Sequence, residues 1–139
     1  ITPLHYACWI SENSETPKII EYLIEKDADI EARCDAGWTP LMYASTSTSD
    51  VFAVKKIDIL LRHGAAINKR MVAGGTPLYL AIFNHKGPLV IKKLVENGAD
   101  VSILTNGRSL LWTAQNCNQP FADEIVQILL DALNEDKKN

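Results

Sequence analysis

One short motif recurs along the chain and limits what it can fold into more than any other feature. The copies TPLHYA, TPLMYA and TPLYLA begin at Thr2, Thr39 and Thr76, and a degenerate copy, SLLWTA, begins at Ser109. These starts are spaced at 37, 37 and 33 residues. A recurrence at this period indicates a solenoid, in which similar supersecondary units stack in one direction.

Each copy of the motif predicts the start of a helix. A Thr or Ser hydroxyl can accept a hydrogen bond from an amide of the first helical turn, which has no partner within the helix. Proline suits the next position because its φ is already helical and its missing N–H is not needed there. The alanine that closes each copy is small, which lets neighbouring helices approach closely.

A second helix is expected after each first one. The apolar runs Ile19–Ile24, Ile57–Leu61, Val90–Val95 and Ile125–Leu130 have near-helical spacing. The first three are followed by Asp-Ala or Gly-Ala pairs that begin at Asp27, Gly64 and Gly98. Glycine can adopt the left-handed conformation that ends a helix. Asp27 has to do the same at some energetic cost.

The first copy of the motif fits T-P-L-H-x-A, the signature of ankyrin repeats, and the chain resembles this family over nearly its whole length. The resemblance implies an all-α solenoid of stacked helix–turn–helix units with short β-turn fingers between repeats. It implies a single domain over residues 1–139, with repeats at about 1–37, 38–74, 75–107 and 108–133 and a polar tail at 134–139. It also implies that His5 is a structural histidine that bonds to a neighbouring loop.

The chain departs from the family pattern in three places. The motif and the helix stop are 25 residues apart in the first two repeats but 22 in the third. We expect the extra residues between the paired helices, in Ser11–Pro17 and around Ser45–Asp50, where loops absorb insertions at little cost. In the fourth copy Leu110 replaces the proline. The first repeat has no finger before it and no polar capping substitution at Tyr6 or Leu23, so we expect the C-terminal part of a longer array.

Composition excludes several classes of partner. The 139 residues carry a formal net charge of −3 and show no lysine or arginine cluster, which argues against a nucleic-acid-binding face. Every apolar run is far shorter than the roughly 20 residues that span a bilayer, so no membrane span is expected.

Cys8, Cys34 and Cys117 form no C-x-x-C pair. We interpret them as reduced thiols of an intracellular protein, in the cytoplasm or the nucleus.

The sequence predicts no enzyme. A catalytic nucleophile needs a base within hydrogen-bond reach, and no motif around the three thiols supplies one or predicts a lowered pKa. The three histidines have no metal-ligand spacing, and no phosphate-binding loop or nucleophile elbow occurs. We therefore expect no catalytic residue, no cofactor and no metal.

The resemblance implies where a partner binds, because ankyrin-repeat proteins bind partners on the finger tips and on the exposed face of the first helices. Carried over by position, the implied site residues are Trp9, Arg33, Asp35, Trp38, Arg70, Met71, Val72, Phe83, Asn84, Arg108 and Asn116. Five of these are large apolar residues, which is unusual for a surface and indicates an interaction site. Arginine, a residue type enriched at interface hot spots, occurs once per finger. The predicted partner is a protein or peptide, with acidic groups beside apolar anchors or with a helix that lies in the groove.

The function predicted is a non-catalytic protein-interaction or scaffold module, and we expect a monomer while leaving the oligomeric state open. One alternative is a targeting or regulatory arm of a larger enzyme or channel whose catalytic part lies outside this chain. Another is a groove for a small ligand or lipid headgroup, although the groove positions are too scattered to supply convergent polar groups. The resemblance also implies that Asn68 occupies a position hydroxylated in some relatives; the alternative is a turn asparagine that bonds backbone groups.

Overall fold

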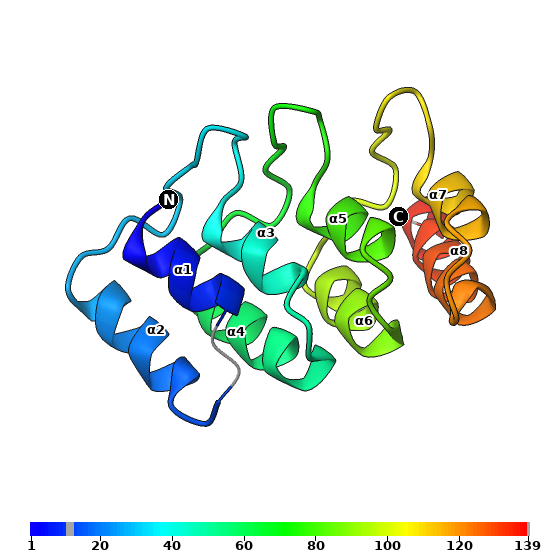
Figure 1. Cartoon of the computed structure of the whole chain (residues 1–139). Coiled ribbons are helices and arrows are strands. Elements are labelled where there is room, and N and C mark those ends of the chain that lie inside the picture. The colour runs from blue at the N-terminus through cyan, green and yellow to red at the C-terminus, as the bar shows by residue number, and fades with distance from the viewer. Residues whose placement is uncertain (11–12, 139) are drawn as a thin grey trace.

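A computed structural model describes residues 1–10 and 13–138, and within them the chain forms eight α-helices (Figure 1). In chain order they are α1 (Pro3–Ile10), α2 (Thr16–Glu25), α3 (Pro40–Ser45), α4 (Asp50–Arg62), α5 (Pro77–Phe83), α6 (Pro88–Glu96), α7 (Leu110–Asn116) and α8 (Ala122–Lys138). The inner helices α1, α3, α5 and α7 form one layer and the outer helices α2, α4, α6 and α8 form the second. The predicted all-α solenoid is confirmed.

All four copies of the motif begin a first helix in the predicted way. The hydroxyls of Thr39, Thr76 and Ser109 accept hydrogen bonds from the amide three residues later, at 3.4, 3.2 and 3.1 Å. Thr2 accepts the same bond from the amide of His5 at 3.4 Å. The alanine of every copy is buried, and so is the leucine of the first three copies. In the fourth copy Leu111 is only partly buried, and Leu110, at the proline position, is buried instead. The motif thus places one face of each inner helix in the core.

The helix stops also form as predicted. Asp27, Gly64 and Gly98 have φ values of 62°, 88° and 94°, all in the left-handed region. The amide of the following alanine then bonds the carbonyl five residues back, as in Ala65 N to Leu60 O at 3.0 Å. This closure satisfies carbonyls that the end of the helix leaves without a partner. It also turns the chain from the outer layer toward the next finger.

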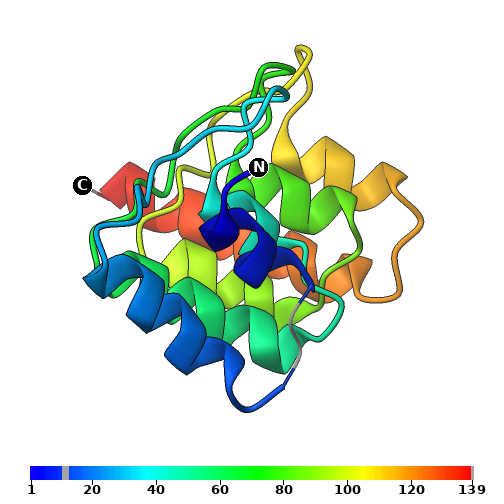
Figure 2. The same ribbon diagram turned by 60° about the vertical axis from the view of Figure 1, so that its left-hand side comes forward.

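Three fingers connect the repeats and lie side by side at one edge of the array (Figure 2). They join α2 to α3, α4 to α5, and α6 to α7. Each contains a tight turn, closed by Gly37 N to Cys34 O at 2.8 Å, by Gly74 N to Met71 O at 2.8 Å, and by Arg108 N to Thr105 O at 3.0 Å. The only β-pairing in the described part of the chain is the isolated bridge between Thr105 and Arg108. The predicted β-turn fingers are therefore present.

The expectation that the extra residues of the second repeat lie between its helices, around Ser45–Asp50, is wrong. Residues 46–49 separate α3 from α4 and residues 84–87 separate α5 from α6, so these two segments are equally long. The extra residues of the second repeat instead lengthen its outer helix, since α4 has 13 residues and α6 has 9. In the first repeat α2 begins at Thr16, and residues 11 and 12 of the predicted insertion lie outside the described residues. The polar residues from 134 to 138, expected as a tail, continue α8 as helix. Among the described helices, none combines the length and the apolar character that crossing a bilayer requires.

Candidate partner-binding face

A strip of aromatic and apolar side chains runs along the inner helices beside the bases of the fingers. We call it the concave strip; its members are Trp9, Trp38, Tyr43, Met71, Tyr79, Phe83 and Trp112. At its N-terminal end Tyr43 lies between Trp9 and Trp38, with ring centroids 6.0 and 5.1 Å away. Such separations are typical of favourable aromatic pairs. Trp9 nevertheless remains 49% exposed, so its packing leaves a large apolar surface facing solvent.

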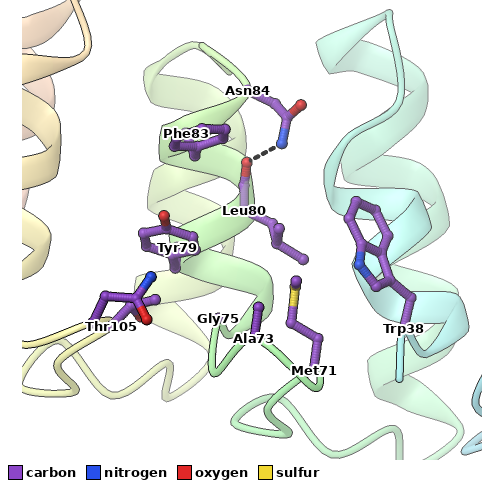
Figure 3. A pocket seen from close by; sticks show the side chains of 10 residues that line it. Trp38, Met71, Ala73, Gly75, Tyr79, Leu80, Phe83, Asn84 and Thr105 are labelled. Carbon is purple, nitrogen blue, oxygen red and sulfur yellow. Dashed lines mark hydrogen bonds between the residues drawn. The ribbon is translucent and has the colours of Figure 1, made fainter. Parts of the chain in front are cut away.

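The centre of the strip is hollowed into a pocket of about 250 Å³. Figure 3 shows Trp38 on one side, the α5 side chains of Tyr79, Leu80 and Phe83 on the other, and Met71 rising from the second finger between them. Phe83 is 53% exposed although it stacks on Tyr79 at 5.7 Å. The remaining lining is Ala73, Gly75, Asn84, Thr105 and Asn106. A mostly apolar hollow of this size has room for one large side chain of a partner.

The strip continues past α5 to α7 through a smaller hollow. Tyr79, Phe83 and Thr105 line both hollows, and Trp112 and Arg108 border the second one. The Arg108 guanidinium lies 4.0 Å from the centroid of the Trp112 ring, which is within range of a cation–π interaction. This contact places a positive charge directly beside the apolar strip.

The arginines of the first two fingers hold the fingers together. Arg33 Nη2 donates a hydrogen bond to Arg70 O at 2.7 Å, and Arg70 Nη2 donates one to Leu104 O at 2.6 Å. Arg70 also donates from Nε to Gly74 O at 2.8 Å within its own finger. Both side chains remain exposed, so their charges still contribute a positive potential along the fingers. Sequence reasoning assigned these residues to partner binding alone and did not predict this second use.

The structure brings together four of the eleven predicted site residues in the main pocket, namely Trp38, Met71, Phe83 and Asn84. Trp9 and Arg108 adjoin the same strip. Asp35, Val72 and Asn116 are exposed but line neither hollow, and Val72 is 76% exposed on the second finger. Each of these positions stays a prediction.

Sequence reasoning missed Tyr79 and Leu80 as pocket residues. Tyr79 and Trp112 occupy the position of His5 in their copies of the motif. His5 does pack: it is fully buried, and its Nε2 lies 3.0 Å from Trp38 O, as the family resemblance implies. The signal that could have found Tyr79 and Trp112 is the change from a histidine to a large aromatic residue that cannot reproduce this bond.

The thiols differ in their surroundings. Burial raises the pKa of Cys8 to about 12, an effect that the nearby Lys56 partly offsets. At Cys34 partial burial acts in the same direction, but the Tyr43 hydroxyl, which donates to Sγ at 3.5 Å, and the amides of Trp38 and Ala36 outweigh it. The pKa of Cys34 is therefore lowered from its ordinary value, which corrects the expectation that no thiol has a lowered pKa.

Asn68 bridges two fingers through its side-chain amide. Its Nδ2 donates to Gly98 O at 3.2 Å, and its Oδ1 accepts from Asp100 N at 2.8 Å. These are the backbone bonds expected of a turn asparagine. Hydroxylation of Asn68 stays a prediction.

Stacked helix–turn–helix units with parallel fingers and a continuous apolar strip define a solenoid repeat protein. A family model described as ankyrin repeats in three copies matches residues 1–71, and one described as an ankyrin repeat matches residues 73–106. The chain belongs to the ankyrin-repeat family. Domains of this family are generally protein–protein interaction modules and are typically non-catalytic. A search of curated proteins found no match.

Proposed function

We propose that this chain is a non-catalytic interaction module that binds a segment of another protein along the concave strip. The observation that carries the proposal is the main pocket, because the exposed Phe83 and the partly buried Trp38 and Met71 surround a hollow open to solvent. A contiguous exposed apolar patch of this kind marks an interaction site more often than single exposed residues do. The partner we propose presents one large apolar side chain to this pocket.

The charges around the strip support an acidic flank on the partner. Arg33, Arg70 and Arg108 are exposed, one on each finger, and Arg108 borders the strip. Because two of them already bond backbone carbonyls, they are held in fixed positions and need lose little freedom on binding. We therefore propose a segment with an apolar anchor and neighbouring carboxylates, bound as a helix or an extended strand.

A small-ligand function is less well supported by the same pocket. Ligand pockets are usually about 300–1,000 Å³ and enclose most of the ligand, with a few convergent polar groups. Here the hollow is about 250 Å³, and the amide of Asn84 is already bonded to Leu80 O at 2.7 Å. Its lining suits an apolar side chain that enters from a larger partner.

Affinity capture from cell lysate with three baits tests the proposal. The baits are the unaltered chain, the strip variant Met71→Ala/Phe83→Ala, and the control variant Val51→Ala/Leu89→Ala, whose residues are comparably exposed on the outer helices. A partner retained by the first and third baits and lost from the strip variant supports binding at the strip. Loss of about 2 kcal/mol at a hot spot corresponds to roughly 30-fold weaker binding. Equal capture by all three baits would contradict the proposal.

A further inference from the structure

A groove lies along the outer helices α6 and α8, which are side by side in the array (Figure 1). It consists of two adjoining hollows of about 290 and 170 Å³. The two hollows share Val95, Ala132 and Glu135, and we call them together the outer groove. None of its lining residues lines either hollow of the concave strip, so the outer groove is a separate surface.

The groove extends along α8 because this helix continues where the other outer helices end. The chain leaves α6 at Gly98, four residues after the buried Leu94. Four residues after the corresponding buried Leu129, α8 is still helical and runs on to its end at residue 138. The extra helical residues include Glu135 and Asp136, which line the same hollow as the helix stop of α6.

The outer groove has an apolar floor and an acidic rim. Val95, Ile128 and Ala132 are partly buried and pack against the hydrophobic core. The charged residues that line the groove are Lys92, Glu96, Asp100, Asp131, Glu135 and Asp136. One cation and five carboxylates make the groove more negative than the −3 of the whole chain. A groove lined mainly by one sign of charge attracts partners of the opposite sign.

The neighbouring pair of outer helices neutralises its charges internally, whereas the outer groove does not. Between α4 and α6, Lys93 Nζ lies 2.7 Å from Asp58 Oδ1. Among the residues that the structure describes, no ion pair includes a carboxylate of the outer groove. Asp131 Oδ1 accepts a hydrogen bond from Gln127 Nε2 at 2.8 Å, but this donor is neutral. The carboxylates of the groove are therefore free to pair with cations of a partner.

We propose that the outer groove binds a basic amphipathic helix of another protein. The apolar side chains of that helix lie on Val95, Ile128 and Ala132, and its lysines or arginines pair with the carboxylates of the rim. A groove between two helices suits this mode of recognition, in which an amphipathic helix places its apolar face inward. The required charge is opposite to that of the acidic segment proposed for the concave strip. The chain therefore has two binding surfaces for segments of different chemistry.

The test measures binding of a fluorescently labelled lysine–leucine peptide, designed as an amphipathic helix, by its anisotropy at low ionic strength. A lysine–serine peptide with the same number of lysines controls for charge alone. We expect the lysine–leucine peptide to bind at least roughly 10-fold more tightly, because its leucines bury apolar area on the floor of the groove. Equal affinities of the two peptides would overturn the proposal.

Two charge-matched variants locate the binding. Glu96→Gln/Glu135→Gln removes two carboxylates from the groove, and Glu25→Gln/Glu124→Gln removes two elsewhere. Glu25 ends α2 as Glu96 ends α6, and Glu124 lies at the other end of α8. The groove variant should bind the lysine–leucine peptide about 5-fold more weakly, since each exposed ion pair contributes little, and the control variant should bind it as the unaltered chain does. Equal weakening by both variants would overturn the proposal.

Two further measurements keep the result independent of any change in folding. All four glutamates are exposed, so both variants should unfold close to the midpoint of the unaltered chain. Carbodiimide, which joins a lysine to a carboxylate in contact with it, should link the peptide to Glu96, Glu135 or Asp136 of the unaltered chain. Crosslinks confined to Glu25 and Glu124 would overturn the proposal. A dimer of the chain alone that the groove variant dissociates would assign the groove to a second copy and would also overturn it.

Discussion

At the residue scale, Gly37 allows a close approach between the first and second fingers. Its φ is +77°, and a Cβ added there would meet Val72 N at 2.9 Å and Arg33 Nη2 at 2.7 Å. Gly107 has a similar φ of +73°, but the space around it is open. Alanine substitutions at Gly37 and Gly107 therefore separate the energetic cost of the left-handed backbone conformation from the cost of a steric clash.

We expect Gly37→Ala to lower the free energy of unfolding by about 2–3 kcal/mol, since it adds a steric clash to left-handed strain. Gly107→Ala should lower it by only about 1 kcal/mol, from the conformational term alone. Urea denaturation of the two variants measures the difference. Equal losses would show that the first finger can move away from the second at no cost.

The thiols give a second prediction at this scale. The thiolate is the reactive form, so Cys34, whose pKa is lowered, should react with iodoacetamide at pH values where an ordinary thiol of pKa 9.0 is still largely protonated. Cys8 is fully buried, and its pKa is raised to about 12, so it should react only after unfolding. Mass spectrometry of peptides labelled between pH 6 and 9 checks both, with Cys34→Ser as the control. Native-state labelling of Cys8 at the rate of Cys34 would contradict this order.

At the scale of single elements, the helix stops predict a stabilising substitution. Asp27 adopts φ 62° at the position where the next two repeats have glycine. Asp27→Gly should raise the free energy of unfolding by about 0.5–1 kcal/mol, because the left-handed strain it relieves exceeds the entropy that glycine loses. Gly64→Asp, the reverse change in an open site, should lower it by a similar amount. Thermal unfolding compares the pair, and an unchanged or lowered midpoint for Asp27→Gly would refute the argument.

Local patterns predicted these elements well because each depends on residues close in sequence. The Thr or Ser that caps an inner helix and the glycine that ends an outer one act within one or two helical turns, so the repeated motif was enough. Contacts between fingers, in contrast, could not be predicted from local patterns. The bond from Arg70 to Leu104 O links residues 34 positions apart, and no local pattern indicates that an exposed arginine has a structural partner.

At the scale of the whole molecule, the hydrogen-bond partners of the buried Lys56 could not be predicted from the sequence. It lies at a core position of α4, where its neighbouring repeats have Ile19 and Val90, yet it is fully buried. A buried charge persists only when tertiary partners satisfy it, and two of these are Cys8 O at 3.1 Å and Ser47 Oγ at 3.0 Å. The apolar pattern predicted which helix positions face the core, but the hydrogen-bond partners of Lys56 depend on how the repeats stack.

The candidate site, too, could be predicted only in part from the sequence. Trp38, Met71 and Phe83 were predicted from their positions in the repeat, and the structure brings them to one pocket. The hollow itself could not be predicted, because it depends on Tyr79 and Leu80 facing Trp38 across two repeats. A repeat pattern specifies which residues lie on the concave face, whereas the shape of that face depends on side-chain packing between units.

Binding at the concave strip is tested most directly by photo-crosslinking. The photoreactive aromatic residue benzoylphenylalanine replaces Phe83 in the main pocket or, as the control, Leu89 on α6, two residues that are 53% and 51% exposed. After irradiation in lysate, we expect the partner found by affinity capture to crosslink to position 83 and not to position 89. Crosslinking of that partner at position 89 alone would contradict binding at the strip and would move the site to the outer helices.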